Sequence, residues 1–312
     1  MVLSHRVARL LLATLAGALA AAGATGLGCS GREGRVDIPR PDPPTLATIP
    51  PEAGDEAASG GPETPKGELA ITPMASPPPP ERIPKLSFVA PKPNEAVPVE
   101  KADAFEVRLD IKDWFIEPGD HVHLVLDNKP YKALEDPKAT IKLGDVFPAE
   151  PLAEGSHVLT AFPARATHLT IKPERARSAR PGTAADAGPF AVVSFWIGKA
   201  AKTPAWKAGD PMLVYSRPKG TYNGADADDL LLDFYLANVD LGEGRSSIRA
   251  TVSAPGREPM QLTINRWTPF KIQNLPSGST KVLLELCDKD GKALLGTFSR
   301  VEREISVNRD AK

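Results

Sequence analysis

The chain has 312 residues, of which 41% are hydrophobic and 25% charged, and its 38 basic and 39 acidic residues leave a net charge of −1. This near-zero balance gives no electrostatic basis for binding nucleic acid. Fourteen of the 33 prolines fall between Pro39 and Pro84, in a stretch without Phe, Trp or Tyr, so the length available to fold is shorter than the chain.

The first 28 residues are predicted to be an export signal. Arg6 and Arg9 precede an apolar run from Leu10 to Ala22, and small residues follow that run. A run of about 13 apolar residues is shorter than the roughly 20 that a membrane-spanning helix needs. We therefore expect these residues to direct export rather than to cross the membrane.

The segment around Cys29 resembles the lipobox of bacterial lipoproteins, with the sequence Gly26-Leu27-Gly28-Cys29-Ser30. Gly26 stands where the family has an aliphatic residue, and Leu27 follows one position later. The resemblance implies that residues 1–28 are a lipoprotein signal peptide and that Cys29 becomes an acylated first residue, which would anchor the chain to a membrane. Ser30 in place of Asp implies the outer membrane, by resemblance to Gram-negative lipoproteins. The alternative is an ordinary secretory signal followed by an incidental cysteine.

Residues 29–84 are predicted to be a disordered, Pro-rich tether. They contain the run Pro77-Pro78-Pro79-Pro80 and many Ala, Gly, Glu and Thr residues, a composition typical of an extended, solvated spacer. A polyproline run can instead be a ligand for aromatic grooves.

From Leu86 onward, short runs of alternating apolar and polar residues predict strands, and no long helical pattern is present. The expected strands in the first half are 105–111, 121–126, 139–143, 157–162, 168–171 and 190–197. Those in the second half are 212–215, 230–236, 247–252, 260–264, 269–272, 281–286, 292–298 and 302–307.

An internal repeat of about 125 residues divides this region in two. Residues 105–116 parallel residues 230–241, and residues 152–159, with a turn at Gly155-Ser156, parallel residues 275–283, with a turn at Gly278-Ser279. Two tandem β-sandwiches, modules 85–199 and 200–312, would give such a repeat. Signal, tether and repeat together resemble bacterial envelope lipoproteins with tandem immunoglobulin-like modules. The cysteine pair of antibody domains is absent, so Trp114 and Trp267 are expected to pack without a disulfide, and Cys287 is expected to be buried and unpaired.

The histidines of the first module are the candidate metal ligands. His121 and His123 are two residues apart, so they share one face of a strand and could chelate one ion. His157 could join them if its strand were adjacent, with Asp120 or Asp127 supporting the site. Otherwise the histidines lie on a solvated face or serve a structural role, while Val122 and Leu124 fill the core.

A cupin-like metalloenzyme is the catalytic alternative. The corresponding residues would be Gly119, His121, His123 and Asp127, then Pro151, Gly155 and His157. Only one residue separates Gly119 from His121 where cupins have several, and Asp127 replaces a glutamate. Aspartates 226, 228, 229 and 233 could hold Ca²⁺ but lack the ligand spacing of a known loop, which favours an acidic turn. Asp288–Gly291 is predicted to be a hairpin turn.

We expect a non-enzymatic protein without a cofactor. Local motifs of serine hydrolases, zinc proteases and nucleotide-binding proteins are absent from the sequence. The predicted function is a membrane-anchored, exported lipoprotein that is a binding or structural module of the cell envelope. Its expected partners are the membrane, through acylated Cys29, and an envelope protein or polysaccharide. The alternative is a metal-binding protein or cupin-like metalloenzyme that uses the histidines of the first module. Arginines 175, 177 and 180, in the segment 173–189, suggest either a mobile loop or an anion or partner site.

Overall fold

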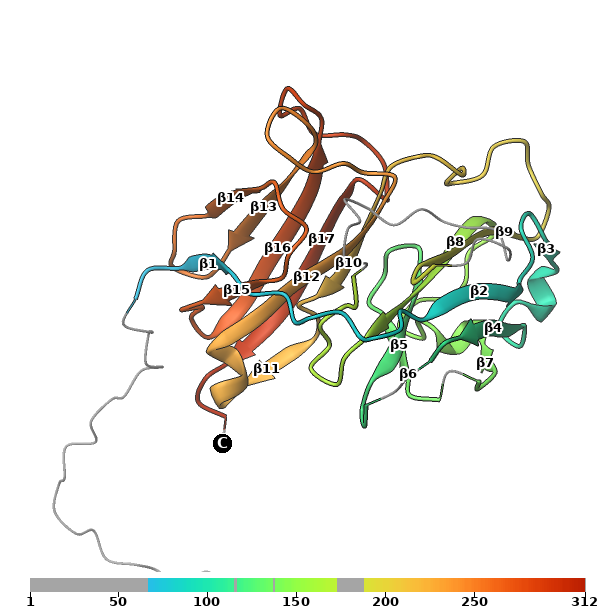
Figure 1. The fold of residues 1–312 in the computed structure, drawn as a ribbon, viewed down its shortest axis with the longest axis horizontal. Helices are drawn as coiled ribbons and strands as arrows, with labels where there is room; N and C mark the ends of the chain where they lie inside the picture. The colour runs from blue at the N-terminus through green and yellow to red at the C-terminus, as the bar shows by residue number, and fades with distance from the viewer. Residues whose placement is uncertain (1–66, 115–116, 137, 173–187, 312) are drawn as a thin grey trace, which may run out of the picture. The chain divides into compact units, whose positions relative to one another are not determined.

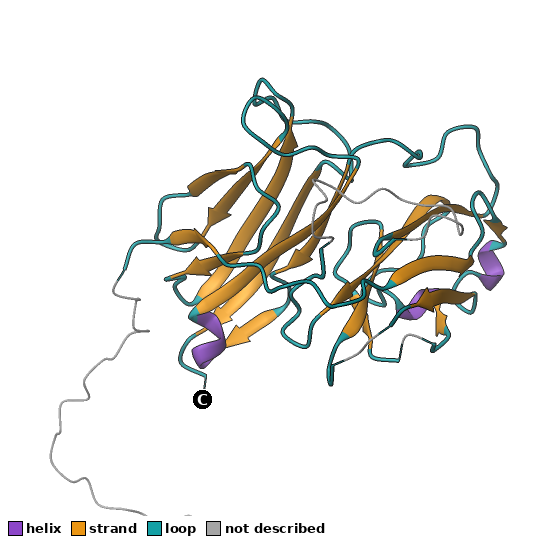
Figure 2. Cartoon of the chain, in the orientation of Figure 1, coloured by secondary structure: helices purple, strands orange, loops and turns teal. Residues whose placement is uncertain are grey.

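The computed structural model describes residues 67–114, 117–136, 138–172 and 188–311. The predicted signal, Cys29, the tether up to residue 66 and arginines 175, 177 and 180 lie outside these residues. Strands dominate the described chain, with short 3₁₀ turns at Val99–Lys101, Leu143–Asp145 and Gly224–Ala227 (Figure 2). In the part of the chain that is described, no helix is long and apolar enough to cross a membrane.

The first module is a sandwich of a three-stranded and a five-stranded sheet. The small sheet has the order β2 (Lys85–Ala90), β4 (Glu106–Lys112), β7 (Ile141–Lys142). The large sheet has the order β3 (Ala96–Val97), β9 (Ala191–Ile197), β8 (Gly155–Ala164), β5 (His121–Leu126), β6 (Lys132–Leu134). Among the described strands of this module, β3 and β9 pair in parallel and the other pairs are antiparallel.

The second module repeats this plan with a four-stranded and a five-stranded sheet (Figure 1). One sheet has the order β1 (Ala70–Pro73), β15 (Phe270–Gln273), β12 (Asp229–Ala237), β10 (Met212–Arg217). The other has the order β11 (Thr221–Asn223), β17 (Arg300–Asn308), β16 (Gly278–Cys287), β13 (Ser247–Ser253), β14 (Met260–Ile264). Strand β11 pairs in parallel with β17, as β3 does with β9.

This shared strand order is that of an immunoglobulin-like sandwich, with strands A, B and E in one sheet and A′, G, F, C and C′ in the other. The predicted fold class, two tandem immunoglobulin-like sandwiches, is therefore confirmed. The segments matched by the internal repeat are equivalent strands, β4 with β12 and β8 with β16. Gly155 and Gly278 open β8 and β16 with φ angles of 135° and 126°, a conformation that favours glycine.

Each module has its own core between its two sheets. Leu124, Leu159 and Phe195 are fully buried in the first core, and Phe234, Ile248 and Leu284 in the second. Trp114 and Trp267 are partly buried and pack against these clusters. Cys287 is buried and unpaired, as predicted.

Strand β1 corrects the predicted limit of the tether, because it lies within residues 29–84 yet pairs with β15 of the second module. It occupies the position of strand D beside strand E. Ile71 on β1 is 5% exposed and belongs to the second core. Hydrogen bonds from Met74 N to Pro269 O and from Thr268 Oγ1 to Met74 O continue the attachment past the strand. Pro73 ends the strand, where its missing N–H costs no ladder bond.

A third hydrophobic cluster joins the two modules. Val125, Phe162 and Phe190 from the first module pack with side chains of the second, including Val214 and Tyr235. The rings of Phe162 and Phe190 lie 4.8 and 5.0 Å from that of Tyr235. Burying apolar surface across the junction favours a single folded unit, and both modules fall in one compact unit.

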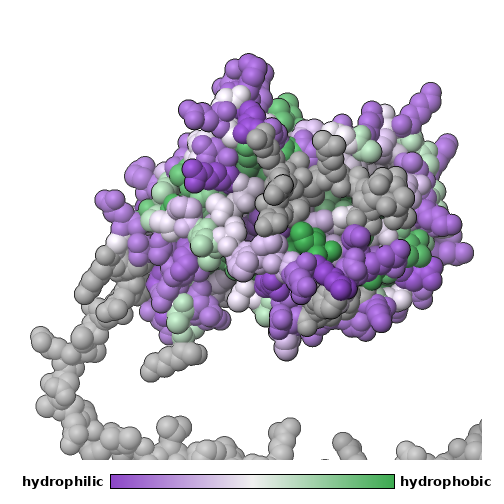
Figure 3. Space-filling view, viewed as in Figure 1, coloured by the Kyte–Doolittle hydropathy of each residue, from purple (hydrophilic) through white to green (hydrophobic). Residues whose placement is uncertain are grey.

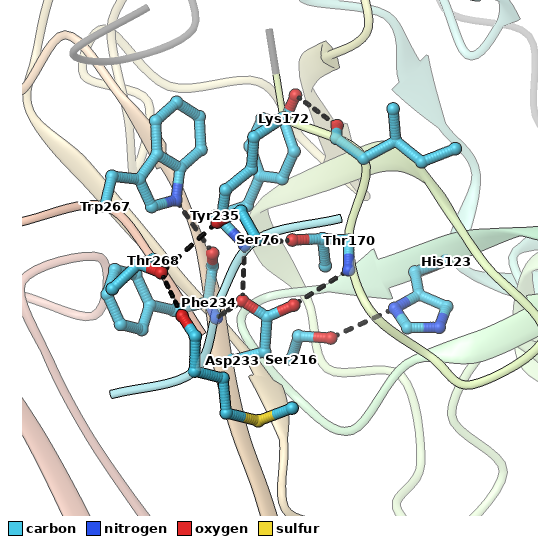
Figure 4. Close-up of polar contacts among 12 residues, drawn as sticks. Ser76, His123, Thr170, Lys172, Ser216, Asp233, Phe234, Tyr235, Trp267 and Thr268 are labelled. Carbon is cyan, nitrogen blue, oxygen red and sulfur yellow. Dashed lines mark hydrogen bonds and ion pairs between the residues drawn. The ribbon is translucent and has the colours of Figure 1, made fainter. Parts of the chain in front are cut away.

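Buried polar contacts cross the same junction. Lys172 Nζ lies 2.6 Å from Asp233 Oδ1, and Thr170 N donates to Asp233 Oδ2, which places a fully buried carboxylate of β12 against the first module (Figure 4). The buried Arg303 guanidinium donates to the carbonyl oxygens of Asn128 and Lys129 in the first module and to those of Tyr215 and Ser216 in the second. Because a buried polar group is costly without partners, these bonds fix how the modules meet.

Some expected strands are wrong. Residues 168–171 and 292–298 are mostly irregular, and each segment has one isolated bridge, Thr170 to Ala164 and Ala293 to Cys287. The predicted turn at Asp288–Gly291 is confirmed by the bond from Gly291 N to Asp288 O. Strands β2, β3, β6 and β11 were not expected.

Candidate metal centre

His121 and His123 lie on β5, a strand whose six residues are all buried. Val122, Leu124 and Leu126 face the core of the first module, as the alternation predicts. The other face of the strand meets the junction cluster instead of solvent, so the two histidines are 3% and 0% exposed. The expectation of a solvated face is therefore wrong for both of them.

A tight turn after β8 brings a third histidine to the same place. Strand β8 pairs Ala164 with His121, and the chain then reverses through bonds from His168 N to Arg165 O and from Arg165 N to Leu169 O. His168 adopts a left-handed conformation with φ of 64°. The reversal points its half-buried imidazole back at the start of β5.

Gly119 is part of the same arrangement. A Cβ on this residue, which has φ of 88°, would lie 2.8 Å from Cβ of Ala166 in the turn. The turn that carries His168 can therefore approach β5 closely only because residue 119 has no side chain.

Three ring nitrogens converge. His121 Nε2 lies 2.9 Å from His123 Nε2 and 3.1 Å from His168 Nδ1. One ligand atom from each of these three histidines lies within 4.8 Å of the other two. The three rings are hereafter called the histidine cluster.

If the rings are neutral, the hydrogen bonds of His121 Nδ1 and His123 Nδ1, which face away from the cluster, determine which tautomer each ring adopts. Gly119 O accepts a hydrogen bond of 2.9 Å from His121 Nδ1, so His121 Nε2 carries a lone pair. His123 must then donate from Nε2 to His121, and its Nδ1 accepts from the Ser216 hydroxyl at 3.0 Å, the contact drawn in Figure 4. His168 Nδ1 donates to the same lone pair. Ser216 belongs to β10, so the second module completes the cluster.

The surroundings favour the neutral forms of His123 and His168. Burial, then the charges of His121, His168, Arg217 and Lys219, holds the pKa of His123 well below its ordinary value. Burial, followed by Arg217, His121 and Lys219, lowers the pKa of His168 to about 4. Neutral imidazoles keep one lone pair each, which a metal ion requires of a histidine ligand.

Tyr131 separates the cluster from one of those cations. Its ring stacks on His123 at 3.5 Å with an interplanar angle of 11°, and Lys219 Nζ lies 3.6 Å from the centre of the same ring. Because a stacked imidazole covers one face of the phenol, the ammonium must occupy the other face. The ring is thus held between a histidine and a cation.

His157 does not join His121 and His123. The antiparallel register pairs His121 with Ala164, seven residues along β8 from His157, which corresponds to about 23 Å of strand. His157 instead bonds Asp127 Oδ2 at 2.6 Å and Ala153 O at 2.8 Å. The predicted set of His121, His123 and His157 is corrected to His121, His123 and His168.

The other expected supporting residues also lie elsewhere, and the cupin-like alternative fails with them. Asp127 bonds His157 and Val158 N at the far end of β5. Asp120 bonds Arg165 Nη1 and Ala166 N, so it holds the turn that carries His168 rather than facing the ring nitrogens. The cupin pattern requires the histidine of its second motif to meet His-x-His, and this chain places it at the opposite end of the strand.

The cluster lies beside an open cavity of about 400 Å³. His168 and Arg217 line it, together with Tyr222, Asp226 and Asp229 from the second module. Asp229 is bonded to Lys271 and Gln273, and Asp228 to Arg309, so these carboxylates form ion pairs instead of a calcium site. His168 is the member of the cluster through which the cavity reaches the buried rings.

No protein-family model matches the chain, and no curated protein matches it. Solved structures with some similarity include fibronectin(III)-like modules of Clostridium thermocellum CbhA, at 12% identity and a TM-score of 0.23, covering 72% of this chain and 94% of that one. The FN1–FN3 domains of chicken CNTN1 give 8% identity and a TM-score of 0.20, covering 70% and 68%. A putative membrane anchored protein from Corynebacterium diphtheriae gives 10% identity and a TM-score of 0.21, covering 72% and 59%. Such low scores carry no argument, so the immunoglobulin-like assignment rests on the strand order of the chain itself.

Proposed function

We propose that the chain is an exported lipoprotein, anchored to the outer membrane through acylated Cys29, whose two sandwiches act as one non-catalytic binding or structural element of the envelope. The observation that carries this proposal is the shared junction core with its buried polar contacts. A fused pair of sandwiches holds the loops and strand edges of both modules at fixed separations, as a rigid spacer or binding element needs.

The outer surface suits contact with a polar partner. On the face drawn in Figure 3, hydrophilic residues predominate and hydrophobic ones form small separate patches. The large hydrophobic side chains that are exposed among the described residues are Val89 and Val99 in the first module and Leu295 in the second. An envelope protein or a polysaccharide, bound at strand edges or loops, fits such a surface better than an apolar partner.

Lipid attachment can be tested with the two cysteines as a matched pair. Cells of a Gram-negative host that express the full chain are labelled with radioactive palmitate and separated into membrane and soluble fractions. We expect label and outer-membrane location in the wild type and in Cys287→Ala, whose changed residue is buried, and neither in Cys29→Ala. Label that persists in Cys29→Ala, or an unlabelled wild type in the soluble fraction, would contradict the anchor.

The binding role is tested separately by photo-crosslinking in intact cells. Gln261 is exposed on β14, the outermost strand of its sheet. A photoreactive residue there should give one reproducible adduct with an envelope protein or glycan, whereas the same probe at Lys289, in an exposed turn, should not. Equal, diffuse labelling from both positions would refute a defined partner at this edge.

A further inference from the structure

We propose that His121 Nε2, His123 Nε2 and His168 Nδ1 together bind one first-row transition-metal ion, of the class of Zn²⁺ or Cu²⁺. This site goes beyond the proposed envelope role and does not depend on it. Imidazole ligands suit these ions, whereas Mg²⁺ and Ca²⁺ require oxygen ligands.

Two of the three nitrogen–nitrogen separations are close to those of a coordination sphere. Tetrahedral Zn²⁺ with Zn–N bonds of about 2.0–2.1 Å places its ligand atoms roughly 3.3–3.4 Å from one another. The two separations that involve His121, 2.9 and 3.1 Å, would widen by a few tenths of an ångström. The ligand atoms of His123 and His168 are constrained only to lie within 4.8 Å of one another, and binding would bring them to the same roughly 3.3–3.4 Å through rotation of the half-buried His168 ring.

Without an ion the cluster is imperfectly bonded. His121 Nε2 has one in-plane lone pair, and the N–H groups of both His123 and His168 point at it. In the bound state all three lone pairs face the ion. His123 then carries its proton on Nδ1 and His168 on Nε2, so these two rings change tautomer, His121 keeps its own, and no proton is lost from the cluster.

Two groups behind the rings already orient them for metal binding. Gly119 O holds the Nδ1–H of His121, which keeps Nε2 available as a ligand. Ser216 Oγ faces His123 Nδ1 and can accept a hydrogen bond from the Nδ1–H of the bound tautomer. Such outer hydrogen bonds set ring orientation and ligand basicity in metal sites. Because Ser216 comes from the second module, that module would contribute to the affinity of the site.

The approach to the site leaves room for a fourth ligand. His121 and His123 are buried, while His168 is half-exposed beside the cavity, so a water molecule could complete the coordination from that side. The charge of Arg217 opposes a cation here, whereas the carboxylate of Asp226 lines the same cavity. Tyr131 lies between His123 and the charge of Lys219.

The test is calorimetric titration of the full chain, purified without a polyhistidine tag and treated with a chelator, with Zn²⁺ and then Cu²⁺. We expect one ion per chain for at least one of these metals and none for Ca²⁺. His168→Asn is the central variant because asparagine tolerates the left-handed conformation of residue 168. Losing one of three nitrogen ligands should weaken binding by at least about 100-fold, the upper end of the loss caused by removing an outer hydrogen-bond partner.

Matched controls separate a metal site from a general loss of structure. His157→Asn changes the histidine at the other end of the strand and should bind as the wild type does. Ser216→Ala should weaken binding about tenfold, as expected for a residue that orients a ligand. Circular dichroism and thermal unfolding without metal establish that each variant is folded.

X-ray absorption of the loaded wild type should show three imidazole nitrogens at about 2.0–2.1 Å for Zn²⁺. The proposal is overturned if neither metal binds the wild type saturably, if folded His168→Asn binds as tightly as the wild type, or if His157→Asn loses as much affinity as His168→Asn.

Discussion

Asn128 offers the sharpest test of how the modules are joined. It lies in the turn after β5 with φ of 60° and is buried against β10 of the second module. Its Nδ2 donates to Leu213 O at 2.8 Å and to Thr297 O at 3.0 Å, and its Oδ1 accepts from Tyr215 N at 2.9 Å. One side chain thus satisfies three main-chain groups of the other module.

Asn128→Ala removes all three bonds and leaves those groups buried. At a net value of about 1 kcal/mol for each bond, the loss should be about 3 kcal/mol. Alanine also tolerates a positive φ less well, which adds about 1 kcal/mol. Asn94 is the matched control, because it has φ of 61° but is exposed, so Asn94→Ala should cost only the second amount.

Equilibrium unfolding in urea, followed by tryptophan fluorescence and far-UV circular dichroism, gives the free energy of unfolding for each variant. We expect Asn128→Ala to be about 3 kcal/mol less stable than Asn94→Ala. A difference below about 1 kcal/mol would show that these bonds do not hold the modules together and would refute the reasoning.

Three further outcomes follow from other contacts. Ile71 lies on β1, the strand within the predicted tether, and Ile71→Ala should reduce the free energy of unfolding of the full chain in urea by about 2–3 kcal/mol. No change would mean that β1 does not pair in solution. Burial lowers the pKa of His157, but the hydrogen bond and charge of Asp127 outweigh this and raise it above 6.5. The stability that this pair contributes is therefore fully present below about pH 6.5 and is lost as the pH rises through the raised pKa. The difference in free energy of unfolding between the wild type and Asp127→Asn should shrink as the pH rises. Urea titrations in which this difference grows with pH would contradict the assignment. Gly155→Ala should reduce the free energy of unfolding by about 1 kcal/mol from its positive φ alone. Gly278→Ala should reduce it more, because its Cβ would lie 2.8 Å from Pro255 Cγ. Equal losses of stability in thermal unfolding would refute this contact.

Strands with a clear alternating pattern could be predicted from the sequence. The expected ranges 121–126 and 260–264 match β5 and β14 residue for residue. Strands β3 and β11, of two and three residues, are too short to show any period. Strand β1 could not be predicted, because the proline-rich composition is an average over residues 29–84. A strand of only four residues is enough to pair with the edge strand β15.

The candidate site could be predicted only in part, because it depends on register. The spacing of His121 and His123 placed both on one face of a strand, and the structure confirms that placement. Which third histidine meets them depends on where β8 ends, and the sequence shows its start near Gly155 more clearly than its end at Ala164. The position of His168, four residues after the end of β8, was the available signal, because a chain reversal at Ala164 brings this residue back to the start of β5. Burial of both rings could not be foreseen, because the second module supplies it.

Differential scanning calorimetry of the full chain tests most directly whether the two sandwiches unfold as one cooperative unit. The described region spans about 245 residues, for which unfolding as one unit near 60 °C corresponds to an enthalpy of roughly 170 kcal/mol. We predict a single transition whose van't Hoff enthalpy equals the calorimetric enthalpy. Asn128→Ala should lower the midpoint temperature of this one transition without splitting it. Two transitions, each with about half that enthalpy and only one of them moved by Asn128→Ala, would contradict it.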